Sequence, residues 1–228
     1  MVGEKYFDTY ISFSRLTGAT ALTSTRAFFD DGISVRDLTK AVFQKLNLKV
    51  ENAVWPVQIH SGTVHFTQNP GPVADCDGVI TDHDSLILLL QTADCVPVFM
   101  ADTQGRFRGL IHAGWRGLRQ HIVSHAAELM KDRGVPADEL IIATGPSICR
   151  ECYNVGDDVA KYFPDHIGLY SHRMTLDLQG IVRDQLLESG IPRKNILLTK
   201  RCTLCHTERY VSYRLNQTHN RLLSILRK

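Results

Sequence analysis

The 228-residue sequence has neither a strong excess of charge nor a long apolar run. Lys and Arg number 26 against 24 Asp and Glu, so a net charge of +2 gives no electrostatic reason to expect a nucleic acid or a membrane surface as partner. The longest apolar run, residues 86–90, is far too short to cross a bilayer. No apolar segment follows Lys5, so we expect no secretory signal and a cytoplasmic location.

Internal repeats, low-complexity tracts and linkers are also absent from the sequence, which predicts a single domain over residues 1–228. Neither a G-x-G-x-x-G segment nor a Walker A segment occurs, so a nucleotide cofactor is not expected. In a reducing compartment the six cysteines are expected as metal ligands, nucleophiles or buried thiols rather than as disulfides.

Short apolar segments alternate with helical patterns along the chain. Apolar runs bounded by turn residues predict strands over 85–90, 96–100, 107–112, 140–144, 195–199 and 210–213. Helical spacing predicts helices over 118–131, over 157–163 and from Asp177 to about Glu188. Because tight turns join several neighbouring strands, we expect a mixed sheet in an α+β or layered α/β/α domain.

Three soft metal ligands lie at or near the ends of short apolar segments: His60, Cys95 and His112. Two imidazoles and a thiolate leave one position open, as in a catalytic zinc site, and their ligating atoms should then lie within roughly 4 Å of one another. The same residues allow a second interpretation, a hydrolase with Cys95 as nucleophile and His112 as base. In the glycine-flanked loop predicted after His112, Arg116 is a candidate to bind phosphate or carboxylate.

The remaining cysteines form two C-x-x-C pairs, Cys149 with Cys152 and Cys202 with Cys205. Together they could form a four-cysteine zinc site, although the gap between the pairs is much wider than the usual spacing of about 15–20 residues. The second pair, followed by His206, also matches the haem attachment pattern, which requires export. His121 and His125 have the spacing of paired zinc ligands on a helix but lack the glutamate of H-E-x-x-H.

Several ordered motifs resemble the YfiH/YlmD family, also called the laccase-domain or multicopper polyphenol oxidoreductase family, which includes the peptidoglycan-editing factor. The matching segments are Ser24-Thr25-Arg26, Gln58-Ile59-His60-Ser61, Asp77-Gly78-Val79-Ile80-Thr81, Thr92-Ala93-Asp94-Cys95-Val96-Pro97, His112-Ala113-Gly114-Trp115-Arg116-Gly117, Gly145-Pro146-Ser147-Ile148, Cys152-Tyr153-Asn154-Val155-Gly156, Cys202-Thr203 and Ser212-Tyr213-Arg214. They extend over most of the chain.

The resemblance implies a layered α/β sandwich with a zinc ion held by His60, Cys95 and His112. It also implies phosphorolysis of adenosine, inosine, guanosine and methylthioadenosine, together with deamination of adenosine. The expected partners are therefore purine nucleosides and phosphate.

The residues in and near these motifs supply further candidates for such chemistry. Substrate contacts are expected at Arg116, Arg26, Asp77 and Gln58, and Asp94 or Asp77 is the candidate to transfer protons. A multicopper oxidase needs clustered H-x-H pairs, and the ten histidines form none, so we expect zinc rather than copper. The alternative functions are a Cys–His hydrolase that edits peptidoglycan precursors and a copper-dependent polyphenol oxidase.

Overall fold

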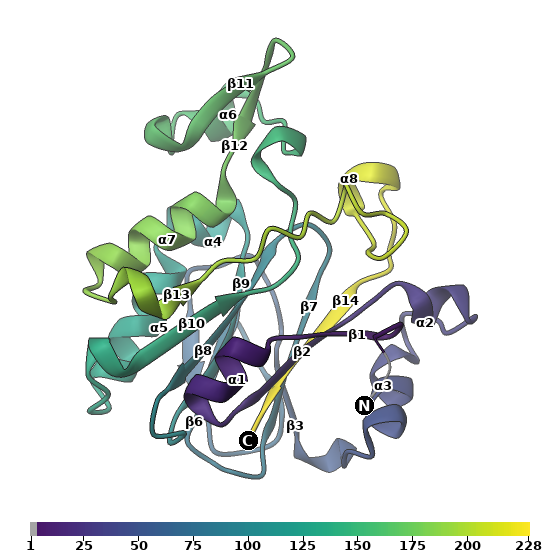
Figure 1. Ribbon diagram of the computed structural model, residues 1–228, viewed down its shortest axis with the longest axis vertical. Helices are drawn as coiled ribbons and strands as arrows, with labels where there is room; N and C mark the ends of the chain where they lie inside the picture. Colours follow the sequence, from purple (N-terminus) through teal and green to yellow (C-terminus); the bar gives the residue numbers. More distant parts are fainter. Residues whose placement is uncertain (1–3) are drawn as a thin grey trace.

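The computed structural model describes residues 4–228 and consists mainly of two six-stranded sheets (Figure 1). The first sheet has the order β1-β2-β14-β7-β3-β5 and the second the order β13-β10-β8-β9-β6-β4. Strands of the first sheet are β1 Phe7–Thr9, β2 Thr20–Ser24, β14 Leu222–Arg227, β7 Ile87–Thr92, β3 Ala53–Pro56 and β5 Gly71–Val73. Strands of the second are β13 Ile196–Leu197, β10 Leu140–Thr144, β8 Val96–Asp102, β9 Arg108–Ala113, β6 Gly78–Thr81 and β4 Val64–Phe66.

Both sheets combine parallel and antiparallel pairs, which confirms the predicted α/β class with mixed sheets. A separate hairpin, β11 Ile167–Tyr170 with β12 Arg173–Leu176, projects from the body of the molecule beside α6 (Figure 1). The helices are α1 Ile11–Thr17, α2 Ala27–Asp30, α3 Leu38–Leu46, α4 Trp115–Arg119, α5 Ile122–Lys131, α6 Asp157–Ala160, α7 Leu178–Glu188 and α8 Tyr213–Asn216. In the described residues, no helix is long and apolar enough to cross a membrane.

The alternation of side chains along the strands divides the core into layers. In β7, Leu88 and Leu90 pack between the two sheets, whereas Ile87 and Leu89 pack against the cluster that includes α3. In β8, Phe99 lies in the layer between the sheets, and its neighbours on either side pack toward α5 and α7. The resulting order is helix, sheet, sheet, helix, with α3 on one side and α5 and α7 on the other (Figure 1).

Two strand ends bring candidate ligands to one place. The turn 93–95 carries the chain from β7 in the first sheet to β8 in the second, and Cys95 is its last residue. Strand β9 pairs with β8 so that His112 lies opposite Pro97. The register therefore fixes His112 next to the strand that begins directly after Cys95.

The strands predicted at 85–90, 96–100 and 107–112 correspond to β7, β8 and β9 with shifted ends, and the strand predicted at 140–144 has the same bounds as β10. The predicted strand 195–199 is reduced to the two residues of β13. Asp177 caps α7 as expected, because its side chain accepts a hydrogen bond of 2.9 Å from the Gly180 amide.

Four expectations about secondary structure were wrong in whole or in part. The helix predicted over 118–131 is two helices, because His121 between α4 and α5 has a left-handed backbone with φ of 56°. Helix α4 begins at Trp115, so the expected loop after His112 is helical. The strand predicted over 210–213 is absent, because Ser212 accepts a hydrogen bond from the Leu215 amide and starts α8. The helix predicted over 157–163 ends at Ala160.

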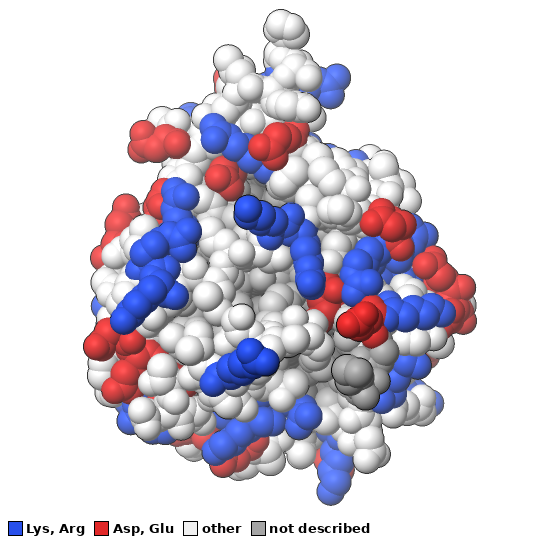
Figure 2. Space-filling model, in the orientation of Figure 1, with Lys and Arg blue, Asp and Glu red and all other residues white. Residues whose placement is uncertain are grey.

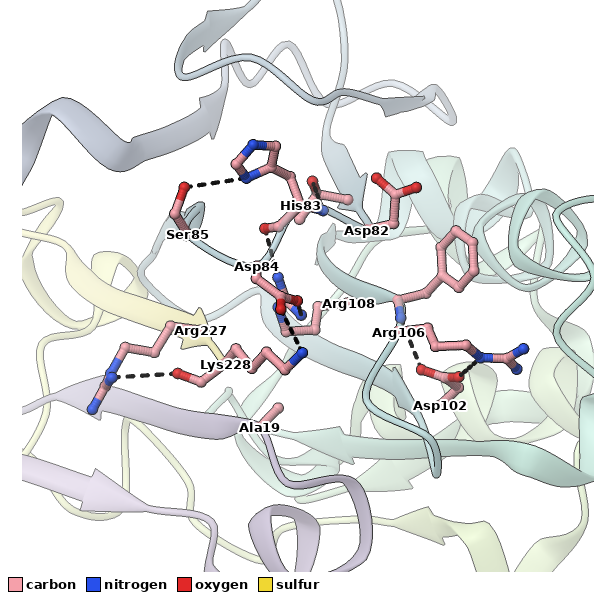
Figure 3. Close-up of polar contacts among 12 residues, drawn as sticks. Ala19, Asp82, His83, Asp84, Ser85, Asp102, Arg106, Arg108, Arg227 and Lys228 are labelled. Carbon is pink, nitrogen blue, oxygen red and sulfur yellow. Dashed lines mark hydrogen bonds and ion pairs between the residues drawn. The ribbon is translucent and has the colours of Figure 1, made fainter.

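Arg108 is a fully buried cation at the start of β9, at the opposite end of this strand from His112 (Figure 3). One guanidinium nitrogen donates to the His83 carbonyl at 2.8 Å, and Asp84 lies 3.9 Å from another. Nε and Nη1 have no hydrogen-bond partner. Burial lowers the pKa of Arg108, with nearby carboxylates acting in the opposite direction. Because two of its nitrogens lack hydrogen bonds, we expect this buried cation to reduce stability.

Candidate metal centre

His60, Cys95 and His112 converge on one point. Their ligating atoms all lie within 4.8 Å of one another, and the two imidazole rings meet edge to face with centroids 4.9 Å apart. The structure thus brings together the three residues that were selected from the sequence, at a spacing close to the predicted value. Two imidazoles and one thiolate are donors that suit zinc and leave a fourth position open.

Asp77 fixes two of these residues, His112 directly and His60 through its loop. One carboxylate oxygen accepts a hydrogen bond of 2.8 Å from Nδ1 of His112, which leaves Nε2 for the cluster. The other oxygen accepts bonds from the amides of Ile59 and Ser61 and from the Ser61 hydroxyl, and so fixes the loop that carries His60. Metal-binding histidines usually donate their second ring N–H to such a carboxylate. Asp77 is fully buried and does not line the cavity beside the cluster, which is described below. The structure therefore places Asp77 behind the ligands and not at the substrate position predicted for it.

Glycines allow the backbone to approach the cluster closely. A Cβ atom on Gly114 would lie 2.9 Å from Sγ of Cys95 and 3.7 Å from the His60 ring. A Cβ on Gly117 would lie 2.8 Å from the carbonyl oxygen of Ser61. Helix α4 can therefore pack against the His60 loop only because these positions have no side chain.

Two site residues have left-handed backbone conformations that are uncommon outside glycine. The φ angle of His60 is 62° and that of Asp94 is 83°. Such strain persists only where surrounding contacts fix the conformation, and it concentrates at functional sites. Here the contacts from Asp77 fix the His60 loop.

Charges within the cluster support each other. Burial alone would raise the pKa of the Cys95 thiol, but His112 and His60 outweigh it and lower that pKa to about 6. Burial alone would lower the pKa of His112, but Cys95 and Asp77 raise it to about 9. The metal-free protein therefore favours a thiolate beside an imidazolium. Binding of a metal would displace the proton from His112, since a ligating imidazole is neutral.

A cavity of about 630 Å³ opens beside the cluster, within the range of small-molecule sites. Its wall includes three arginines, Arg116, Arg214 and Arg221, and three aromatic residues, Trp115, Tyr153 and Tyr213. Each arginine lies over one of these rings, at 4.5, 4.9 and 5.7 Å from the ring centroid. Within residues 4–228 none of the three forms an ion pair with a carboxylate. The cavity thus combines free positive charge with aromatic surface.

A second cavity is also lined by basic side chains, among them Arg150, Arg183 and Arg193, so positive charge is not confined to this one. Figure 2 shows basic and acidic side chains interspersed over one face of the molecule, without a broad area of a single sign. This distribution agrees with the small net charge of the sequence. Arg214 and Arg221 donate hydrogen bonds to backbone carbonyls, but no guanidinium group of the three has a carboxylate partner in the described residues. Such a cavity is suited to a small anion, because arginine binds phosphate or carboxylate through paired N–H donors.

Of the other predicted residues, Gln58 and Asp94 line the cavity and Arg26 does not. The Gln58 side chain exchanges two hydrogen bonds with the backbone of Gln91, at 3.0 and 3.1 Å. The guanidinium group of Arg26 instead pairs with Asp30 at 3.1 Å.

Asp94 uses both carboxylate oxygens within the protein. One accepts a hydrogen bond of 2.6 Å from the Thr203 hydroxyl, and the other accepts one of 2.7 Å from the Arg214 amide. Asp94 therefore ties two late segments of the chain to the turn that carries Cys95. This arrangement makes it a positioning residue more than a proton carrier.

Sequence reasoning assigned no role to Tyr153, Tyr213, Arg214 or Arg221, although all four line the cavity. The first three lie in segments that carry the family resemblance, so a signal for them was present. Burial raises the pKa of Tyr153 to about 12, and the nearby Cys95 thiolate contributes. Its hydroxyl therefore stays protonated and able to donate a hydrogen bond.

A family model described as multi-copper polyphenol oxidoreductase laccase matches residues 18–227. The chain belongs to this family. Its relatives include a protein named adenosine deaminase RL5, from an unknown prokaryotic organism, which is 29% identical over 206 residues that cover 82% of this chain and 79% of the relative. A protein named purine nucleoside phosphorylase from Aquifex aeolicus is 32% identical over 183 residues, covering 80% of this chain and 85% of that protein.

Solved structures of this family have the same fold. YlmD from Geobacillus stearothermophilus superimposes with a TM-score of 0.84 at 26% identity, over 93% of both chains. Bacillus licheniformis YfiH superimposes with a TM-score of 0.85 at 21% identity, over 99% of this chain and 97% of that one. The predicted membership of the YfiH/YlmD family is confirmed.

Proposed function

We propose that this protein is a zinc-dependent purine nucleoside phosphorylase that also deaminates adenosine. The observation that carries the proposal is the His60–Cys95–His112 cluster beside a cavity with three aromatic rings and three arginines that have no carboxylate partner in residues 4–228. Relatives named purine nucleoside phosphorylase and adenosine deaminase, at about 30% identity, support the same class of activity.

The donor set favours zinc over copper. In residues 4–228, histidine occurs in only one group of potential metal ligands, and that group has two histidines. A multicopper centre needs many more. Zinc held by His60, Cys95 and His112 would supply a Lewis acid beside the substrate.

The arginines of the cavity would bind phosphate, and its aromatic rings would bind the nucleoside. Arg116, Arg214 and Arg221 would hold phosphate through charge-assisted hydrogen bonds. Trp115 and Tyr213 would offer flat apolar surfaces for the purine. In phosphorolysis a phosphate oxygen bonds to C1′ of the ribose while the bond from C1′ to the purine nitrogen breaks, so orientation of the two reactants accounts for much of the rate.

Tyr153 is the candidate to assist the leaving purine, because it lines the cavity and its hydroxyl is protonated. For deamination the same aromatic surfaces would orient adenine, and water would replace phosphate as the second reactant. Asp77 would keep His112 in one orientation during both reactions.

One observation favours a second candidate function. Asp77, His112 and Cys95 form a connected series of a carboxylate, an imidazole and a low-pKa thiol, which is the arrangement of a cysteine hydrolase. Such an enzyme would act on an acyl bond, as in the editing of peptidoglycan precursors, and would not need zinc. Metal dependence therefore separates the two candidates.

The test is an assay of purified, metal-analysed protein with adenosine, inosine, guanosine and methylthioadenosine, with and without phosphate. We expect free base and ribose 1-phosphate, or its methylthio analogue, only when phosphate is present. Arg116→Ala should raise the KM for phosphate. Arg119→Ala is the matched control, because Arg119 lies on the same helix but over the Tyr162 ring and outside the cavity. Cleavage of peptides by zinc-free protein, without nucleoside turnover, would favour the hydrolase.

A further inference from the structure

Four cysteines outside the candidate metal centre form a second cluster. Cys149 directly precedes a short 3-10 helix, Arg150–Cys152, whose last residue is Cys152, and Cys202 and Cys205 lie on a loop late in the chain. All four sulfur atoms lie within 4.8 Å of one another. Sγ of Cys205 is 3.5 Å from that of Cys152 and 3.9 Å from that of Cys149.

These distances fit a shared metal ion and not disulfide bonds. A disulfide requires sulfur atoms about 2.05 Å apart. Four sulfurs at about 2.3 Å from a tetrahedral zinc ion are separated by about 3.8 Å. The two measured separations lie on either side of that value, and all four cysteines are free thiols.

The backbone around the cluster supports bound thiolates. Sγ of Cys202 accepts hydrogen bonds from the amides of Cys149 at 3.2 Å and Cys205 at 3.4 Å. A parallel bridge between Ser147 and Cys202 aligns the two segments. Hydrogen bonds of this kind orient metal ligands, and they join the two C-x-x-C pairs despite their wide separation in sequence.

We propose that Cys149, Cys152, Cys202 and Cys205 bind a second zinc ion with a structural role. Four protein thiolates fill a tetrahedral site and leave no position for substrate, unlike the cluster at Cys95. Cys202 is buried whereas Cys205 is exposed, so the site is closed on one side and accessible to an entering metal on the other.

The position of this site indicates what the ion would stabilise. The residue before Cys149, Ile148, donates its amide to the Asp94 carbonyl, and the residue after Cys202, Thr203, donates its hydroxyl to the Asp94 carboxylate. Tyr153, directly after Cys152, lines the cavity. The zinc would thus join the two segments that border the candidate active site and fix Asp94.

Metal analysis of the purified full-length protein tests the proposal independently of any activity. We expect about two zinc ions per chain in the wild type and one in Cys149→Ser and in Cys205→Ser. Glu151→Ala, in the 3-10 helix between two of the ligands, and Cys76→Ser, a free thiol outside both clusters, should keep two. The double variant His60→Ala/His112→Ala should keep one, which separates this site from the proposed catalytic one.

Cobalt substitution gives a second readout. In the His60→Ala/His112→Ala background, cobalt should produce the intense thiolate charge-transfer absorption of a four-sulfur site, and Cys205→Ser should weaken it. Cys205→His, which keeps a ligand, should retain zinc if the serine variant does not fold. Unchanged zinc content in Cys205→Ser, iron in place of zinc, or disulfides among the four cysteines in the unreduced native protein would overturn the proposal.

Discussion

Gly114→Ala tests whether close backbone approach builds the metal centre. The backbone of Gly114, with φ of −86° and ψ of 167°, is one that alanine adopts without strain, so the effect arises from contact alone. The new methyl group would meet Sγ of Cys95 at 2.9 Å, closer than such atoms can lie. Either the sulfur or the start of α4 must move. Overpacking of this kind costs about 1–3 kcal/mol.

If the new methyl group displaces the Cys95 sulfur from its ligand position, the cost appears as weaker zinc binding. Zinc affinity should then drop by about 10-fold to 100-fold, since each 1.4 kcal/mol is a factor of ten. Competition with a chromophoric chelator would measure it. A double-mutant cycle isolates the contact. With Cys95→Ala the sulfur is gone, so Gly114→Ala should lower the free energy of unfolding by less than it does in the wild type. Any effect of Gly114→Ala on the first turn of α4 itself is the same in both backgrounds, so it cancels when the two changes in the free energy of unfolding are subtracted. An equal effect in both backgrounds, with unchanged zinc affinity, would refute the reasoning.

Cys95→Ala should abolish phosphorolysis and deamination together while the protein stays folded; retention of either activity in a folded variant would exclude one shared metal site. Asp77→Asn should reduce zinc affinity by about 10-fold to 100-fold, because the partner that orients His112 is weakened; isothermal titration with zinc measures this, and an unchanged affinity would contradict it. Arg116→Ala should raise the KM for phosphate more than Arg116→Lys, since lysine keeps the charge and loses only the paired geometry; equal effects would argue against a phosphate contact. Arg108→Met should raise the free energy of unfolding by about 1 kcal/mol in urea titrations, because it removes a buried cation with unpaired N–H groups; a loss of more than about 2 kcal/mol would show that the His83 contact matters more.

The sequence predicted the elements that have strong local signals. Apolar runs identified β7 to β10, and Asp177 marked the start of α7. The strand–loop positions of Cys95 and His112 pointed to the cluster that the structure contains. These features depend on the spacing of neighbouring residues, so they can be recognised without knowledge of the fold.

Features that depend on contacts between distant segments were missed or misplaced. Arg214 enters the cavity wall because Asp94 accepts a hydrogen bond from its amide, a contact across 120 positions of sequence. The two C-x-x-C pairs suggested a four-cysteine site as one alternative, although their wide spacing argued against it; the bridge between Ser147 and Cys202 brings the pairs together. Arg26 was expected near substrate, but Asp30, one helical turn later, occupies its guanidinium group. The break at His121 depends on a left-handed residue that the helical pattern conceals.

The measurement that tests the central claim most directly is ribose 1-phosphate formation from inosine by protein stripped with a chelator, as zinc is restored stepwise. The account predicts no product from the stripped protein and recovery of turnover with zinc but not with copper. It also predicts no recovery in the His60→Ala/His112→Ala variant, which keeps the four-cysteine cluster. Full turnover without metal, or oxidation of a phenol by copper-loaded protein with no nucleoside turnover, would contradict the account.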